Sequence, residues 1–209
     1  MRTVPSPLMA VTDRHGHARP LAETVQAILD GGGRWIWFRD RDLESEARLH
    51  LGEAVAGRVR SAGGVLTVGG DIALARALGA DGVHLGSGSG AEAIAAARDA
   101  LGPVALIGVS AHAPQEVAQA AAAGADYVTL SPIFPSASKP GYGPALGLEG
   151  IAAAQKSGLP VVALGGIEPE TVAACRAAGA AAVAVMGGLM RAGDPAGAVR
   201  ALLKALHPA

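Results

Sequence analysis

The chain has 209 residues, of which 50% are hydrophobic and 17% are charged, and its formal net charge at pH 7 is −1. This length and apolar content predict one folded domain over residues 1–209, and they exclude a disordered chain. The near-neutral charge, without a run of Lys or Arg, excludes the electrostatic footprint of a protein that binds nucleic acid or an anionic membrane, so we expect neither partner.

The start of the chain and its single cysteine predict the compartment. Met1–Ala10 is too short and too rich in proline for a signal peptide, and no apolar run approaches the roughly 20 residues of a membrane span. One cysteine, Cys175, excludes a disulfide framework and a cysteine zinc site, and we expect a small buried side chain there. The predicted location is the cytoplasm, and a homo-oligomer remains open.

Eight short apolar segments alternate with Ala-rich stretches of helical periodicity. Apolar runs too continuous to alternate with polar residues are typical of parallel strands that are covered on both faces. Alternating strands and helices predict crossover units, and eight such pairs close a barrel. The expected strands are Leu8–Thr12, Trp35–Arg39, Val65–Val68, Gly82–Leu85, Leu106–Val109, Tyr127–Leu130, Val161–Leu164 and Ala182–Val185, and the clearest helical segments are Leu43–Ala62, Pro114–Ala123 and Pro169–Ala178.

A short internal repeat supports this count. Leu78–Val83 is echoed by Ala123–Val128 and by Ala178–Val183. In each copy a Gly ends a helix and a strand follows at once, and the copies precede the fourth, sixth and eighth expected strands. Two βα units repeated four times fit a barrel better than an open sheet, so the predicted fold class is α/β, a single (β/α)8 TIM barrel.

Paired glycines follow the last two expected strands. In such barrels the loops after the strands build the site, and phosphate often binds after strands seven and eight. Gly165 and Gly166 follow the seventh strand, and Met186 and Gly187 follow the eighth. Backbone N–H groups beside glycine approach a phosphate closely. We therefore predict phosphate binding by the backbone of these four residues; the alternative is that the glycines only turn the chain.

The longest segment without periodicity, Ser131–Gly143, follows the sixth strand. A loop of this length in a compact domain is usually functional. Ser136, Ser138 and Lys139 offer hydroxyl donors and a cation, which suit an anionic substrate. The alternative is a solvated loop with an ordinary surface lysine.

Two histidines occupy different places in the expected strands. His112 follows the fifth strand, with Ser110 beside it, and a histidine at a barrel mouth can transfer a proton near neutral pH. A structural role for His112 is about equally open. His84 alternates with Val83 and Leu85 inside the fourth strand, so a structural side chain facing the barrel interior is expected.

Arg39 and Arg41 end the second strand. Arg39 is placed to clamp an anion, and a salt bridge to Asp40 or Asp42 is an equal alternative.

The order of these motifs resembles the thiamine phosphate synthase/TenI family over nearly the whole chain, from Val11-Thr12-Asp13 to Met186-Gly187-Gly188. The resemblance implies a small phosphorylated thiazole as the substrate. The segments that carry it are Ala80–Gly86, Gly108–Ser110, Gly124–Val128, Ser136–Gly141, Leu146–Gly150 and Val162–Ile167.

The resemblance implies one of two activities. The synthase joins a pyrimidine pyrophosphate to a thiazole phosphate and needs Mg²⁺, whereas the characterised TenI activity is a tautomerase that aromatises a thiazole phosphate carboxylate. In the synthase an Asn-Asp pair follows the third strand and a second metal-binding Asp follows the fourth. This sequence has Gly69-Gly70 and Ser87-Gly88-Ser89 there. Mg²⁺ prefers carboxylate oxygens, and Asp71, one place later, is a poor substitute.

The second strand departs from the synthase as well. The synthase pattern Gln-x-Arg-x-Lys is Trp37-x-Arg39-x-Arg41 here, and Trp cannot both donate and accept as an amide does. TenI proteins resemble this sequence in the Arg-x-Arg spacing, in Ser-Gly-Ser after strand four and in Ser-x-His. The resemblance therefore favours a thiazole tautomerase without metal or other cofactor.

In that hypothesis the catalytic candidates are His112, as proton shuttle, and Lys139. The substrate-binding candidates are Arg39, Arg41, Ser110, Ser136 and Ser138. Two alternatives stay open: a divergent Mg²⁺-dependent thiamine phosphate synthase, and a non-catalytic phosphometabolite-binding or regulatory protein.

Overall fold

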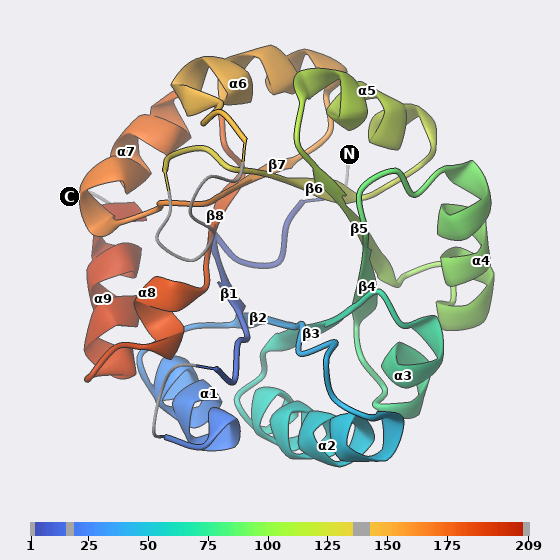
Figure 1. Cartoon of the computed structure of the whole chain (residues 1–209), viewed down its shortest axis with the longest axis vertical. Helices are drawn as coiled ribbons and strands as arrows, with labels where there is room; N and C mark the ends of the chain where they lie inside the picture. Colours follow the sequence, from blue (N-terminus) through green and yellow to red (C-terminus); the bar gives the residue numbers. More distant parts are fainter. Residues whose placement is uncertain (1–2, 16–18, 136–142, 207–209) are drawn as a thin grey trace.

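The computed structural model describes residues 3–15, 19–135 and 143–206, which form a closed barrel of eight parallel strands (Figure 1). Each strand pairs with the next in the sequence, and β8 pairs with β1. The helices form a ring outside the strands (Figure 1). The predicted single (β/α)8 barrel is confirmed. The strands are β1 (Leu8–Val11), β2 (Trp35–Phe38), β3 (Val65–Gly69), β4 (Gly82–Leu85), β5 (Leu106–Ala111), β6 (Tyr127–Leu130), β7 (Val161–Leu164) and β8 (Ala182–Val185).

The helices follow the strands in alternation, and the ends of the expected strands differ from the observed ones by at most two residues. The short helix α8 was not predicted. The helices are α1 (Leu21–Asp30), α2 (Ser45–Ser61), α3 (Ile72–Ala77), α4 (Ala91–Leu101), α5 (Pro114–Ala122), α6 (Gly147–Ala154), α7 (Pro169–Ala177), α8 (Gly187–Met190) and α9 (Pro195–Leu206), with a 3-10 turn at Gln155–Ser157.

Two separate apolar clusters hold the barrel together. Successive residues of a strand point to opposite faces, so most strands contribute to both clusters, whereas β4 contributes Val83 and Leu85 to the outer cluster alone. In β2, Trp35 and Trp37 lie in the cluster that fills the barrel interior, together with Tyr127 from β6. Ile36 and Phe38 lie in the larger cluster between the strands and the helices. The two-residue period fixes which side chains of β2 face the barrel axis.

The internal repeat has a structural role that recurs. The glycine of each copy has a positive φ, of 59°, 88° and 104° in chain order, which suits a residue without a side chain. Asp81 and Asp126 hold the same place in two copies. The Asp81 carboxylate accepts a hydrogen bond from the backbone N–H of Leu66 (2.8 Å), and the Asp126 carboxylate accepts one from Ile107 (2.8 Å). The repeat thus ties the start of one strand to the strand before it.

Two observations bear on the expectations about cysteine and membranes. Cys175 is a free thiol in the core, as expected. None of the helices within the described ranges is long and apolar enough to cross a membrane.

Close contact between strands predicts a strong effect for Gly82→Ala. A Cβ there would lie 1.9 Å from the backbone oxygen of Leu106 on the neighbouring strand, so we expect a loss of about 1–3 kcal/mol of unfolding free energy. Gly57 is exposed in α2 and a Cβ there meets nothing within 4 Å, so Gly57→Ala is the matched control and should stabilise by about 0.5–1 kcal/mol. Urea unfolding measures both, and equal midpoints for the two variants would contradict the close contact.

Candidate active site

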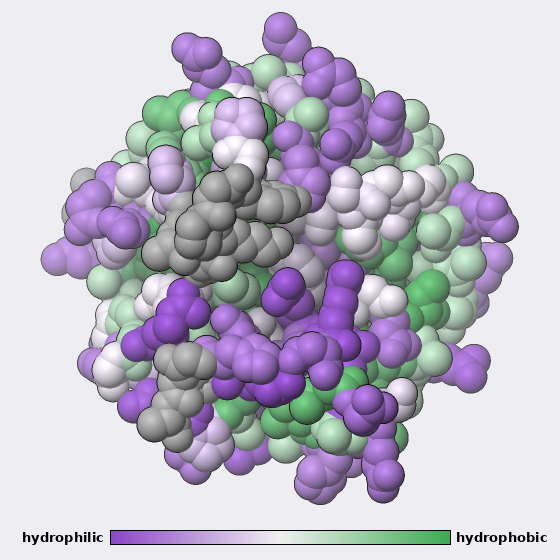
Figure 2. All heavy atoms as spheres, viewed as in Figure 1, coloured by the Kyte–Doolittle hydropathy of each residue, from purple (hydrophilic) through white to green (hydrophobic). Residues whose placement is uncertain are grey.

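A cavity of about 920 Å³ opens at the carboxyl ends of the strands. Its size lies within the roughly 300–1,000 Å³ of small-molecule sites. Figure 2 shows hydrophilic side chains gathered on this face near the centre of the molecule. Among the predicted site residues, those that the structure describes all line this cavity, while Ser136, Ser138 and Lys139 lie outside the described residues. The lining ones are Arg39, Arg41, Ser110, His112, Gly165, Gly166, Met186 and Gly187.

The floor of the cavity is a buried polar cluster around His84. The ring atom Nδ1 lies 3.0 Å from the Tyr127 hydroxyl. The other nitrogen, Nε2, lies 3.1 Å from both Ser110 Oγ and Thr129 Oγ1. The Trp37 ring covers the imidazole, with the ring centroids 4.0 Å apart. The expected structural role of His84 is confirmed, and this histidine positions the two hydroxyls that line the cavity.

Burial fixes the charge state of this cluster. It lowers the pKa of His84 to about 3, with a smaller contribution from the positive charge of Arg41, so the imidazole is neutral near pH 7. Burial likewise raises the pKa of Tyr127 well above its ordinary value, so the phenol keeps its proton. The floor therefore offers neutral hydroxyl groups to a ligand.

His112 stands at the wall of the cavity, held at two points. Its Nδ1 lies 2.8 Å from the backbone oxygen of Ser131, and a carbonyl only accepts, so Nδ1 carries the proton. The backbone N–H of His112 donates to the Glu116 carboxylate (2.9 Å). This tautomer leaves Nε2 as the basic nitrogen of the ring, which is the arrangement required for a general base.

Glu116 has a part in the site that the sequence did not indicate. Its carboxylate also accepts a hydrogen bond from Ser87 Oγ (3.0 Å), in the loop after β4. One carboxylate on α5 thus joins the loops after β4 and β5. Ser87 and His112 are therefore linked through one carboxylate at the wall of the cavity.

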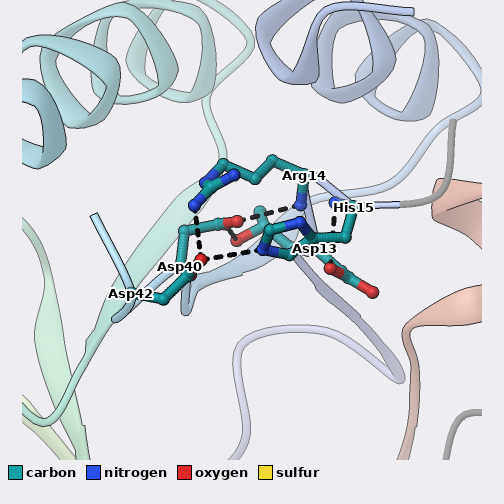
Figure 3. Close-up of polar contacts among 6 residues, drawn as sticks. Asp13, Arg14, His15, Asp40 and Asp42 are labelled. Carbon is teal, nitrogen blue, oxygen red and sulfur yellow. Dashed lines mark hydrogen bonds and ion pairs between the residues drawn. The ribbon is translucent and has the colours of Figure 1, made fainter. Parts of the chain in front are cut away.

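The loops after β1 and β2 are joined by a network of acidic residues (Figure 3). Asp40 accepts hydrogen bonds from Thr12 Oγ1 and from the backbone N–H of Arg14 (2.9 Å). Asp42 pairs with the Arg14 guanidinium and with His15 Nε2 (2.8 Å). Figure 3 shows Asp40 and Asp42 turned toward the loop after β1. Both carboxylates that neighbour Arg39 in the sequence are therefore engaged by the loop after β1.

Arg39 and Arg41 face the cavity instead. Within the described ranges, neither guanidinium group has an ion-pair or hydrogen-bond partner, so the alternative of a salt bridge from Arg39 to Asp40 or Asp42 is wrong. The same alternation that turns Asp40 and Asp42 toward the loop after β1 turns Arg39 and Arg41 toward the mouth. Partial burial, with the positive charges of Arg39 and Arg48, lowers the pKa of Arg41. These two guanidinium groups concentrate positive charge on this side of the mouth.

The glycines after β7 permit a close approach to the loop after β6. Gly165 and Gly166 both have positive φ, and a Cβ on Gly166 would lie 2.5 Å from the backbone oxygen of Pro135. Gly165 O accepts from the backbone N–H of Phe134 (2.9 Å). These glycines therefore do turn the chain, as the alternative interpretation expected. The same backbone also lines the cavity. After the neighbouring strand β8, Gly187 begins α8, whose first N–H groups have no acceptor inside the helix.

Asp13 and Arg191 are cavity residues that the sequence did not predict. The Arg191 guanidinium lies 3.4 Å from the Asp13 carboxylate and links α8 to the loop after β1. Asp13 directly follows the first expected strand, and this position could have indicated that it lies at the mouth of the barrel. Arg191 lies at the end of the unpredicted helix α8, so no sequence signal placed it at the mouth.

Comparison with known proteins identifies the family. The family model described as thiamine monophosphate synthase matches residues 8–189. The chain belongs to this thiamine monophosphate synthase family. A putative thiamine-phosphate synthase of Geobacter sulfurreducens is 40% identical over 210 residues, covering 100% of this chain and 98% of the relative. A thiamine-phosphate synthase of Chromobacterium violaceum is 43% identical and covers 93% of each chain.

A solved structure of the thiamine monophosphate synthase family has the same barrel. The thiamine phosphate pyrophosphorylase of Pyrococcus furiosus superposes with a TM-score of 0.83 at 29% identity, covering 95% of this chain and 94% of its own. The names of these relatives point to the synthase and not to the TenI branch. The family is confirmed; the tautomerase hypothesis gains no support from the names.

The Mg²⁺ that a synthase requires does not fit the residues around β3 and β4. Gly69 and Gly70 offer no carboxylate, and the Asp71 carboxylate caps α3 through Leu74 N and pairs with Arg48 (3.1 Å). Throughout the described parts of the chain, no three His, Cys, Asp or Glu side chains are grouped to hold a metal ion. The Arg41 guanidinium fills the space over Gly70, and a cation there opposes a metal ion.

The buried His84 predicts a loss of stability in acid. An unfolded histidine titrates near pH 6.5, so below that pH the unfolded chain binds a proton that the folded chain excludes until about pH 3. The free energy of unfolding should therefore decrease as the pH falls from about 6.5 to about 3. This histidine contributes up to about 1.4 kcal/mol of that decrease per pH unit. Urea unfolding at about pH 7 and pH 5 measures the fall, which His84→Gln should reduce. Exposed His50 provides the control, His50→Gln, and an unchanged fall in His84→Gln would contradict the assignment.

Proposed function

We propose that this member of the family is a metal-independent enzyme of thiamine biosynthesis that aromatises a thiazole phosphate carboxylate through proton transfer at His112. The observation that carries the proposal is the bond from His112 Nδ1 to the Ser131 backbone oxygen (2.8 Å), which leaves Nε2 as a base at the cavity wall. The absence of a carboxylate from Gly69-Gly70 and from Ser87-Gly88-Ser89, where the synthase holds its metal, supports it.

The proposed reaction needs only one exchangeable proton. Aromatisation removes a proton from a saturated ring carbon and delivers a proton elsewhere in the conjugated system, so no atom is gained or lost and no electron acceptor is required. Nε2 of His112 accepts the first proton and returns it. Lys139 is the second catalytic candidate of the proposal.

The phosphate group anchors the substrate across the cavity from β2. We assign it to the backbone of Gly165, Gly166, Met186 and Gly187, where N–H groups without side chains allow close approach. The Ser110 hydroxyl on the floor contacts the ring. Ser136 and Ser138 remain proposed contacts to the anionic groups.

A second candidate is the Mg²⁺-dependent synthase, and the names of the relatives favour it. It uses the same thiazole phosphate, so the phosphate end of the site serves both reactions. It also requires a metal site, for which Asp71 is already engaged with α3 and Arg48. The two candidates therefore differ at the β2–β4 side of the mouth.

A proton NMR time course tests the tautomerase. Purified protein with EDTA should convert the non-aromatic thiazole phosphate carboxylate to the aromatic tautomer faster than the uncatalysed reaction. His112→Ala should slow turnover by about 10²- to 10⁴-fold, while ligand binding survives, because it removes the base without touching the phosphate site. Wild-type rates in His112→Ala would remove this residue from the mechanism. Tight binding in calorimetry without any chemical change would support a binding protein instead.

A direct assay tests the synthase. We expect no thiamine phosphate from saturating pyrimidine pyrophosphate, thiazole phosphate and Mg²⁺, because the carboxylates that would hold the metal are missing. Product detected by chromatography, lost on adding EDTA, would establish the synthase and overturn the proposal.

A further inference from the structure

The backbone N–H of His112 lies just beyond the hydrogen-bond ladder of the barrel. In the same peptide unit, the carbonyl of Ala111 accepts a hydrogen bond from the backbone N–H of Ser131 on the β6 side (3.0 Å). Because a trans peptide unit directs its C=O and its N–H in opposite directions, the N–H of His112 points toward the β4 side. The pairing of β4 with β5 ends at Leu85 and Val109, so this ladder supplies no carbonyl at that point. The acceptor must come from another element.

One carboxylate oxygen of Glu116 is that acceptor. Glu116 Oε2 accepts hydrogen bonds from the backbone N–H of His112 (2.9 Å) and from Ser87 Oγ (3.0 Å). A glutamate at the third position of a helix commonly reaches back to the N–H of the N-cap residue. The N-cap of α5 is Ala113, whereas this carboxylate reaches one residue further back. Its hydrogen bond therefore holds the residue at the cavity wall.

The ring and the backbone of His112 are fixed from opposite sides. The ring atom Nδ1 is held by the backbone oxygen of Ser131, at the end of β6. The backbone N–H is held by Glu116, which Ser87 ties to the loop after β4. Catalytic groups have to stay within roughly 0.5 Å of their productive positions, and this requires support from the residues behind them. Three loops thus share the placement of one imidazole.

We propose that Glu116 is a positioning residue, which holds the base His112 in place by tying its backbone to the loop after β4 through Ser87. This inference rests on the proposed function and deepens it, because it concerns the base of that reaction. Ser87 and His112 line the cavity, whereas Glu116 does not. Glu116 therefore acts through His112 and not on the substrate.

The chemistry of the carboxylate separates this role from a simple effect of charge. An ionised acceptor forms hydrogen bonds roughly twice as strong as a neutral one, and one oxygen can accept two of them. Glutamine has the same length and keeps one acceptor oxygen, whereas alanine removes the acceptor. A role that depends on the hydrogen bonds is preserved in Glu116→Gln and lost in Glu116→Ala.

Steady-state kinetics of the tautomerisation test the role. Glu116→Ala should lower kcat about 10- to 100-fold, the loss expected when a reacting group is misplaced by about 1 Å. KM should change by less than about twofold, because the proposed phosphate site lies after β7 and β8. Glu116→Gln should restore most of the rate. Ser87→Ala removes one of the two hydrogen bonds and should lower kcat about 2- to 10-fold.

The matched control is Glu23→Ala. Glu23 holds the same third position in α1 and is exposed, so its loss weakens a helix start in the same way without touching the cavity wall. Its kcat should equal that of the wild type. An unchanged kcat in Glu116→Ala, or a Glu116→Gln variant as slow as Glu116→Ala, would overturn the inference.

A second measurement does not depend on turnover. Nitrogen-15 NMR of histidine-labelled protein reports which ring nitrogen carries the proton, and the His112 signal is assigned by its loss in His112→Gln. The wild type should show the Nδ1–H form that the bond to Ser131 requires. Glu116→Ala should give a mixture of the two neutral forms, and Glu116→Gln should keep the wild-type form. A wild-type signal in Glu116→Ala would mean that the ring is held without Glu116, and would overturn the inference.

The two proposals fail separately. If the wild-type protein shows no turnover, the proposed function falls, while the NMR signal of His112 still decides the role of Glu116. If turnover is present and Glu116→Ala changes neither kcat nor that signal, the positioning role falls alone.

Discussion

In a closed barrel of short parallel strands, successive side chains point alternately into the barrel and out toward the helices. The same alternation of side chains continues past the end of β2 into the loop that follows it. Asp40 and Asp42 turn to the loop after β1, where Thr12 and Arg14 engage them. Arg39 and Arg41 turn to the mouth. Without this sorting the arginines would be neutralised by their neighbours in the sequence, and the mouth would carry no unpaired positive charge.

The barrel interior imposes a second condition, that its polar groups be satisfied without charge. His84 meets it as a neutral ring among the hydroxyls of Ser110, Tyr127 and Thr129. A protonated imidazole there would lie near Arg41 in a medium of low polarity, which is why its pKa falls. The proposed function therefore assigns proton transfer to His112, which stands at the wall and whose tautomer is set by a backbone oxygen.

Much of the fold and part of the candidate site could be predicted from the sequence, because short stretches of neighbouring residues indicate them. Apolar runs and the repeated Gly-Ala-Asp gave the strands, and loop position gave His112 and the glycines after β7 and β8. Contacts between distant segments gave no such signal. Glu116 joining two loops and the pair Asp13–Arg191 depend on barrel closure. Sequence proximity was misleading for Arg39, whose neighbouring carboxylates are engaged by the loop after β1.

The names of the relatives favour the synthase, whereas the proposed function is a tautomerase. The contact between β2 and β3 bears on this difference at two positions. A carboxylate at position 70 would need a Cβ 3.0 Å from Arg41 Cζ, in a backbone conformation with φ of +68°. A side chain at position 69 would likewise press on Trp37 Nε1. The Arg41 guanidinium is the far end of a flexible side chain and can move aside, so the positive φ of Gly70 is the firmer obstacle to a side chain there. Trp37, Arg41 and the glycine pair therefore form one packing unit, and the proposed phosphate site lies on other strands, after β7 and β8.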